Sequence, residues 1–417
     1  MNLLAPPQFF WVGSLAFFAL LGGLKRRAAL IKRLLLLVPG LIVLETILVG
    51  DWEGARDYVN WLLGPDRLFL LSVMVLVLAL VWYREWTRPP VALAILGLFT
   101  FGYVLSMFDA NFRLIIKKPD NVPITMMIYF VGFFVWLGLR RAAINDQRTE
   151  KGQPLVEAGA DDKVLVWPDL VYTELICLVL CTVGLVLWGI VLKAPLEQPA
   201  NPAGPPNPSK APWYFLGLQE LLVYFDPWIA GVLLPGLIIL GLMALPYIDT
   251  NPRGNGYFTL KERPFAIFMY FFGFVVLWVI LIVFGTFLRG PNWNFFGPYE
   301  YWDPHRPAAL LNINVSDVFW VKLLGMSLPS REQFGEPWFY LIREAPGLAL
   351  VGAYFFLTPY VLMKTVCREM YARMGFARYS VLMILLLWTL LVPIKMVLRW
   401  LFNLKYFVSI TELFFNI

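Results

Sequence analysis

Ten apolar runs, each 15 to 24 residues long, limit what this chain of 417 residues can fold into. A bilayer core takes about 20 apolar residues per helix, and in lipid a helix satisfies all of its own backbone polar groups. The runs span residues 9–24, 34–49, 69–83, 91–107, 124–139, 170–192, 229–248, 265–288, 347–362 and 381–398. With 59% hydrophobic residues and a mean hydropathy of +0.68, the chain is predicted to be an all-α polytopic transmembrane bundle of about ten spans.

The Lys and Arg residues predict the orientation of these spans. Alternating sides gathers more than half of the 34 basic residues into five loops, residues 25–33, 84–88, 140–163, 253–263 and 364–378. The positive-inside rule places these loops in the cytoplasm. Residues 210–228, residues 289–345 and both termini then lie on the outer side. The tail resists this scheme, because Lys395, Arg399 and Lys405 alternate with aromatic residues as in a basic interfacial helix. Either the tail lies on the outer interface or one span is miscounted.

Charge and metal-binding residue types exclude several classes of function. The net charge of +6 could suit nucleic acid, but the basic residues sit at the ends of apolar runs, so we expect no nucleic-acid partner. Cys177 and Cys181 are four residues apart and are interpreted as small core residues of one helix. A haem b between helices needs two imidazole ligands, whereas this chain offers only His305, in a loop. No metal site is predicted.

Two breaks divide the sequence. Residues 141–165 are polar and form a predicted cytoplasmic linker after an N-terminal module, residues 1–140, of about five helices. A second break, residues 193–213, contains seven prolines and cannot continue a helix. We expect a further module at residues 166–290, followed by an outer loop, two spans and an interfacial tail in residues 291–417.

The order of motifs in residues 166–290 is specific. "WPDLVY" and one long helix lead to "PANPAGPPNPSKAPWYF", an aromatic amphipathic stretch, "DPWIAGVLLPGLIILGLMALPYID" and a basic loop that begins "NPRGNG". This order resembles the C-terminal half of cytochrome b, in particular the separate subunit four of split, plastid-type cytochrome b complexes. In that family a proline-rich run leads into a "PEWYF" signature on the positive side of the membrane. The resemblance implies a short amphipathic helix in the outer loop, next to the quinol-oxidation pocket.

The signature transfers position by position, with one departure. Trp213, Tyr214 and Phe215 match it, Ala211 stands in place of the first proline, and Pro212 stands in place of the glutamate. The resemblance implies that the matching residues, with Pro212 beside them, help to wall the quinol pocket. The family's usual proton acceptor is missing.

Oxidation of a quinol releases two protons, so another acceptor is required. Glu220, about two helical turns after Tyr214, is our candidate; half-buried among apolar and aromatic side chains, it should have a raised pKa. The alternative is a solvated Glu220 on an interfacial helix. Tyr214 is expected to orient a quinol oxygen, and Tyr224 to enclose the ring with the signature residues. Asp226, before Pro227, is expected to cap the next helix.

Two later features are interpreted as structural. The "EPWFY" run at Glu336–Tyr340 lacks a preceding proline run and is expected to be an interfacial anchor. His305 has no companion ligand and is expected to be solvated or bonded to a partner.

The resemblance implies a haem-free subunit of a quinol-oxidising cytochrome bc-type complex in the bacterial inner membrane. Haem b and an iron-sulphur cluster would belong to partners, namely a haem-bearing cytochrome b subunit and a Rieske-type iron-sulphur protein, with a c-type cytochrome as a further partner. The chain would not be catalytic alone. Two alternatives remain: a structural subunit with a decayed quinol pocket, and a membrane transporter, which internal repeats or deep charges would have favoured.

Overall fold

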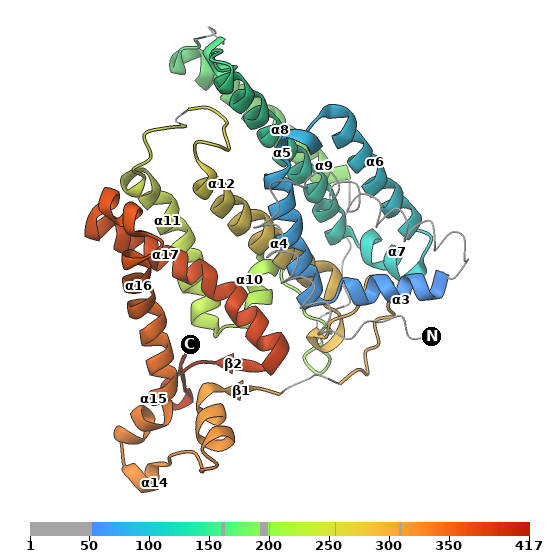
Figure 1. The fold of residues 1–417 in the computed structure, drawn as a ribbon. Helices are drawn as coiled ribbons and strands as arrows, with labels where there is room; N and C mark the ends of the chain where they lie inside the picture. Colours follow the sequence, from blue (N-terminus) through green and yellow to red (C-terminus); the bar gives the residue numbers. More distant parts are fainter. Residues whose placement is uncertain (1–51, 160–162, 192–198, 200, 255, 308–310) are drawn as a thin grey trace.

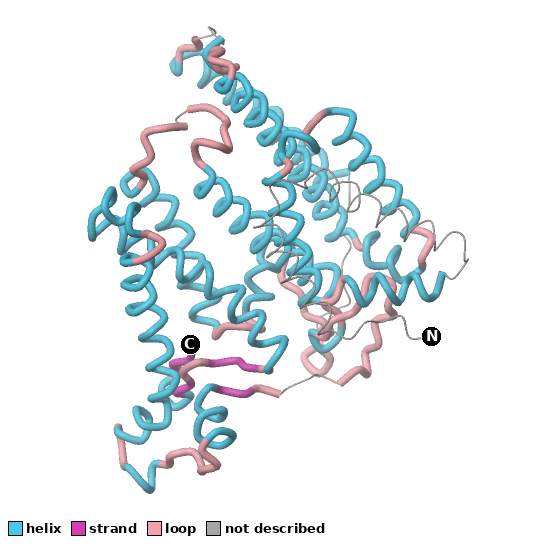
Figure 2. Tube along the Cα trace, viewed as in Figure 1, coloured by secondary structure: helices cyan, strands magenta, loops and turns pink. Residues whose placement is uncertain are grey.

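The chain is a bundle of long apolar helices with very little sheet (Figures 1 and 2). The computed structural model describes residues 52–159, 163–191, 199, 201–254, 256–307 and 311–417. Within these residues seven helices are long and apolar enough to cross a membrane, or eight if the bent pair Glu53–Leu62 and Pro65–Val81, at 74° to each other, forms one span. The predicted all-α polytopic class is confirmed.

The bounds of the elements are as follows. The helices are α3 (Trp52–Leu62), α4 (Pro65–Val81), α5 (Tyr83–Trp86), α6 (Pro89–Ser106), α7 (Ala110–Lys117), α8 (Val122–Glu150), α9 (Val171–Val191), α10 (Leu216–Leu221), α11 (Leu234–Ile248), α12 (Pro264–Phe271), α13 (Ile280–Val283), α14 (Arg331–Phe334), α15 (Trp338–Gly352), α16 (Thr358–Lys364) and α17 (Arg368–Phe402). The strands are β1 (Ile313–Asn314), β2 (Leu404–Tyr406), β3 (Ser409–Ile410) and β4 (Phe415–Asn416). β1 pairs with β2 in parallel, and β3 pairs with β4 antiparallel.

The expected spans agree with these helices from residue 69 onward. Each of the eight runs from 69–83 to 381–398 falls on a helix or on a continuous helical segment such as Pro264–Leu288. The expected spans 9–24 and 34–49 lie outside the described residues. α8 continues to Glu150, so the polar segment that we expected from residue 141 begins as helix. The division into domains stays a prediction.

Two spans have no buried residue at all. Neither α6 nor α9 has a side chain buried within the described part of the chain. Helices that are apolar all round and unpacked need lipid or partner helices around them. The interpretation of Cys177 and Cys181 as core residues is wrong, because both are exposed on α9 with their sulphurs 4.0 Å apart.

A buried polar cluster joins the N-terminal helices to the loop between α11 and α12. Figure 1 shows this loop at the same end of the molecule as the carboxyl end of α8. Asp146 of α8 is 4% exposed and accepts hydrogen bonds from the Tyr83 hydroxyl at 2.8 Å, from the Leu260 N–H at 3.1 Å and from the Thr259 hydroxyl. The neighbouring Asn145 donates to the carbonyl oxygen of Phe258 at 3.0 Å. The sequence did not single out either residue.

Ion pairs surround this cluster. Arg84 makes two hydrogen bonds to Glu150, of 2.8 and 3.1 Å, and Lys261 pairs with the same carboxylate. Loops 84–88, 140–163 and 253–263 therefore meet at one end of the bundle, as the alternation of spans predicts.

Replacing Asp146 with alanine is expected to destabilise the protein by about 1–3 kcal/mol or more, because the Tyr83 and Thr259 hydroxyls lose a buried acceptor. Thermal unfolding of the purified chain in detergent measures the effect. Asp120→Ala is the control, since the Asp120 side chain is 70% exposed. A fall in Tm as small as that of the control would contradict a structural role for the cluster.

The carboxyl-terminal tail lies at the opposite end, beside the segment that follows the proline run. The side-chain amide of Asn416 donates to Asp226 at 2.8 Å, and the indole N–H of Trp228 donates to the Asn416 carbonyl oxygen at 3.2 Å. The tail therefore shares one end of the bundle with residues 226–228, and which side of the membrane this end faces stays a prediction. Lys395 does not lie on the surface: it is 1% exposed, and its ammonium lies over the Phe407 ring, 5.0 Å from the centroid.

A glycine lets the tail approach α15. A Cβ atom added at Gly347 would collide with the carbonyl oxygen of Phe407, whereas one added at Gly352 of the same helix would meet nothing within 4 Å. The tail therefore requires glycine at position 347.

Gly347→Ala is expected to cost about 1–3 kcal/mol, the usual range for overpacking. Gly352→Ala, the matched control, is expected to stay within about 0.5 kcal/mol of the wild type. Thermal unfolding, together with proteolysis of the tail, measures both. Equal behaviour of the two variants would show that the tail does not pack against α15.

Two further glycines bring α10 against the span Pro264–Leu288. A Cβ atom at Gly217 would lie 3.3 Å from Ile282 Cγ1, and one at Gly285 would lie 3.1 Å from the Leu216 carbonyl oxygen. This close approach presses the short helix after the signature into the largest hydrophobic core of the described residues. It places Glu220, the buried polar residue of α10, inside the protein.

Candidate functional site

The end of the proline run folds back on α10. The Ala211 N–H donates to the side-chain oxygen of Gln219 at 2.8 Å, and the Gln219 amide nitrogen donates to the Ser209 carbonyl oxygen at 2.8 Å. Proline has no N–H and blocks a regular helix here, so a side chain from the following helix satisfies the backbone. The expected short helix is present, as a tight turn at Trp213–Phe215 followed by α10.

The signature residues form an aromatic surface. Tyr214 and Phe215 are 49% and 51% exposed, with ring centroids 4.7 Å apart, and Pro212 is exposed beside them. Trp213 is half-buried and meets Tyr214 edge to face, with centroids 5.7 Å apart. Such a surface can receive a flat apolar ring or another protein.

Glu220, five residues after Phe215, lies inside the protein. It is completely buried, so neither the half-buried environment that we expected nor the solvated alternative is correct. Arg289 donates two hydrogen bonds to the carboxylate, from Nη2 to Oε1 at 2.7 Å and from Nε to Oε2 at 3.0 Å. The pair joins α10 to the end of the span Pro264–Leu288.

Two more donors complete the shell of Glu220. The Tyr224 hydroxyl donates to Oε1 at 2.9 Å, and the Trp293 indole N–H donates to Oε2 at 3.2 Å. Burial raises the pKa of the Tyr224 phenol well above its ordinary value, so the hydroxyl stays a donor. Although burial opposes its charge, Glu220 holds the pKa of Arg289 above its usual value.

The six predicted site residues therefore separate into two layers. Pro212, Trp213, Tyr214 and Phe215 share the outer surface, whereas Glu220 and Tyr224 are both buried completely. Tyr224 packs edge to face against Trp400, with centroids 5.9 Å apart, and does not share the exposed surface.

Sequence reasoning missed Arg289 and Trp293. An arginine at the outer end of a span is usually a topological flank, and nothing in its neighbours signals a partner 69 residues away. The only available signal was Glu220 itself, because a carboxylate on an apolar helix face needs a cation as partner.

The two other candidate residues, Asp226 and His305, make contacts that suit a structural role. Asp226 directly precedes the helical residues, as expected of a cap, but its carboxylate accepts from Asn416. His305 is exposed, and its backbone N–H donates to the Asp303 side chain at 2.9 Å. One exposed imidazole does not fit the ligand set of a haem b held between helices. Among the described residues no group of His, Cys, Asp and Glu is arranged to hold a metal ion.

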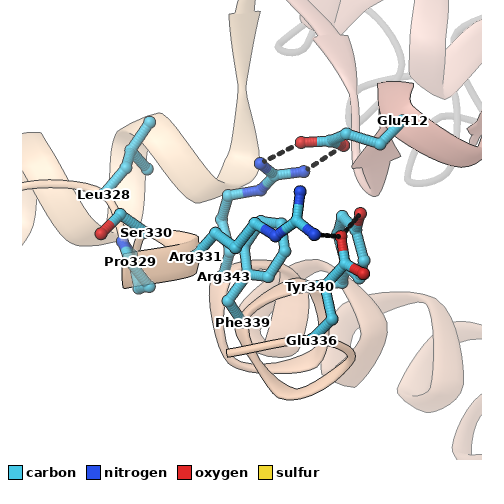
Figure 3. Close-up of a pocket in the computed structure, with 9 residues that line it drawn as sticks. All are labelled: Leu328, Pro329, Ser330, Arg331, Glu336, Phe339, Tyr340, Arg343 and Glu412. Carbon is cyan, nitrogen blue, oxygen red and sulfur yellow. Dashed lines mark hydrogen bonds and ion pairs between the residues drawn. The ribbon is translucent and has the colours of Figure 1, made fainter. Parts of the chain in front are cut away.

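The "EPWFY" run lines a cavity of about 470 Å³ at the start of α15 (Figure 3). Its charged residues already have partners: Arg343 makes two hydrogen bonds of 3.0 Å to Glu412, and Arg331 pairs with Glu336 at 3.2 Å. Trp338 is 63% exposed, consistent with an interfacial anchor.

Comparison with known proteins agrees with the resemblance seen in the sequence. Residues 199–299 match the family described as cytochrome b (C-terminal)/b6/petD. The match contains six of the seven prolines of the proline run, the aromatic signature, Glu220 and Arg289. No solved structure matches the chain.

Proposed function

We propose that this chain, a multi-pass membrane protein with a cytochrome b C-terminal region at residues 199–299, is a haem-free subunit of a cytochrome bc-type complex and forms part of its outer quinol-oxidation pocket. The proposed partners are a haem-bearing cytochrome b subunit, a Rieske-type iron-sulphur protein and a c-type cytochrome. The haem and the iron-sulphur cluster would carry electrons in those partners, and the complex would lie in the bacterial inner membrane.

One observation carries the proposal: the matched region presents its aromatic signature on an exposed surface, and five residues after Phe215 it holds Glu220 in a buried ion pair with Arg289. The rings of Trp213, Tyr214 and Phe215 offer an apolar face to a quinol ring. The Tyr214 hydroxyl can donate to a quinol oxygen. A partner subunit that covers the exposed face would close the pocket and exclude water.

In this proposal Glu220 receives a proton. One quinol O–H would give its proton to a carboxylate oxygen of Glu220, and the second proton would leave through water or a partner subunit. The iron-sulphur cluster and the haem that the partners would hold would supply the two one-electron acceptors. Both oxygens of Glu220 already accept hydrogen bonds, so one donor must first release it. The Trp293 N–H makes the longest of these bonds, at 3.2 Å, and is the natural one to open.

The same shell favours a second candidate, a structural subunit whose quinol pocket has decayed. Pro212 replaces the family glutamate, and all of the hydrogen bonds that Glu220 accepts come from its own protein. In this case the ion pair would only stabilise the packing of α10.

Purification and labelling test the proposal. The chain, tagged in its native membrane, should co-purify with haem b and iron-sulphur partners; its isolation without either would overturn the proposal. In the complex, an inhibitor of the quinol site should protect Tyr214 from tyrosine-specific labelling. Tyr247, 77% exposed near the carboxyl end of α11, should remain labelled. Equal labelling of Tyr214 with and without inhibitor would favour the structural subunit.

A further inference from the structure

Lys210, three residues before Trp213, is a cation without an anion. Its ammonium donates to the backbone carbonyl oxygen of Thr286 at 2.8 Å and lies over the ring of Trp302, 4.7 Å from the centroid. Among the described residues no carboxylate lies within ion-pairing distance of it, which is 4.0 Å. A lysine ammonium carries three N–H donors, so the bond to Thr286 leaves two for a ligand.

The two residues that Lys210 contacts both carry an unused buried polar atom. Thr286 is 1% exposed, and its hydroxyl has no hydrogen-bond partner in the described part of the chain. The indole N–H of Trp302 is likewise buried and unpartnered there. Buried donors without a partner cost about 1–3 kcal/mol each, so their coincidence at one lysine points to an absent acceptor.

The charges around Lys210 have the same sign as Lys210 itself. Burial, together with Lys118 and Arg289, lowers the pKa of the Lys210 ammonium to about 7, and Glu220 raises it only in part. Glu220 is already bonded to Arg289. Lys118 pairs with Asp120 at 3.9 Å and Arg289 pairs with Glu220, so among the described residues Lys210 is the one of these three cations without a carboxylate of its own.

We propose that Lys210, Thr286 and Trp302 form a binding site for a phosphate group, that of an anionic phospholipid of the outer leaflet. The ammonium and the indole N–H donate to phosphate oxygens, and the Thr286 hydroxyl adds a third bond. A lipid is favoured over free phosphate because Thr286 lies two residues from the outer end of the span Pro264–Leu288, at the depth of the headgroups.

Thermal unfolding of the full chain in detergent tests the site. Phosphatidylglycerol is expected to raise the Tm of the wild type by several degrees, whereas diacylglycerol, which lacks the phosphate, leaves it unchanged. Inorganic phosphate at the same concentration should have little effect; an equal effect would overturn the lipid as the source. Lys210→Gln should abolish the shift, and Trp302→Phe, which keeps the ring but loses the N–H, should reduce it.

Lys322→Gln is the matched control, because Lys322 is an exposed lysine in the outer loop before α14. It should respond to phosphatidylglycerol as the wild type does. The same shift in Lys210→Gln as in the wild type, or no shift in the wild type, would overturn the proposal. Neither result bears on co-purification with redox partners, so this test and that of the proposed function fail separately.

The pH dependence provides an independent readout. Because the pKa of Lys210 falls from 10.5 in the unfolded chain to about 7 in the fold, burying its charge destabilises the lipid-free protein fully below pH 7. This cost declines as the pH rises toward 10.5. Lys210→Met should therefore unfold at a higher temperature than the lipid-free wild type, with the largest difference at or below pH 7. The charges of Lys118, Glu220 and Arg289 also act on this site. The Tm of Lys210→Met is therefore compared with the Tm of the wild type at the same pH. Phosphatidylglycerol should remove the difference; a difference independent of both pH and lipid would contradict the site.

Discussion

Replacing Arg289 with methionine is expected to destabilise the protein by about 3–5 kcal/mol, because it leaves the Glu220 carboxylate buried without a cation. Glu220 is fully buried and Arg289 is 8% exposed, so water cannot substitute for the lost partner. Thermal or denaturant unfolding of the purified chain in detergent measures the loss.

The double variant Glu220→Leu/Arg289→Met tests the cause. Removal of both charges should recover most of the stability, less the cost of the Tyr224 and Trp293 donors that lose their acceptor. Arg306→Met is the matched control, since Arg306 pairs with Glu300 at a site where both side chains are more than 40% exposed; its effect should be about 0–1 kcal/mol. If Arg289→Met behaves like this control, the buried pair does not hold α10 in place.

Glu220→Gln in the assembled complex is expected to reduce quinol oxidation by about 100-fold or more, the usual contribution of a positioned proton acceptor. Glutamine keeps the size of the side chain and can still accept from Tyr224 and Arg289, but an amide takes no proton from a quinol. The rate of haem b reduction by added quinol, normalised to haem b content, separates loss of catalysis from loss of assembly.

Two comparisons make this result decisive. Glu300→Gln, a change to an exposed carboxylate of the outer loop, should leave the rate unchanged. If Glu220→Gln also turns over at the wild-type rate per haem, Glu220 has no part in proton transfer. If neither variant changes the rate of haem b reduction, and the inhibitor does not protect Tyr214 from labelling, the chain is better described as a structural subunit.

Local sequence patterns predicted most of the fold. Span length and hydropathy identified eight helices among the described residues, and the alternation of spans predicted that loops 84–88, 140–163 and 253–263 share an end. The proline run and "PWYF" located the short outer helix, and the family match covers both. These features succeed because the lipid requires every span to carry its own apolar length and to satisfy its own backbone.

The candidate site was predicted only in its outer layer. The exposed aromatic signature is contiguous in sequence and could be read directly. The burial of Glu220 could not, because it depends on the close approach of α10 at Gly217 and Gly285 and on a cation 69 residues away. For the same reason, the sequence did not predict the partners of Asp146, which lie more than 60 residues away along the chain. It also did not predict the unpartnered polar atoms of Thr286 and Trp302 beside Lys210.

The sequence by itself determined that the chain crosses the membrane repeatedly, that it carries one histidine, and where the aromatic signature lies along the chain. Only the tertiary structure decided which charged side chains lose their water and which partners replace it. Hydrophobic length is a property of neighbouring residues, whereas the free energy of a buried charge depends on donors and acceptors that folding brings from distant segments.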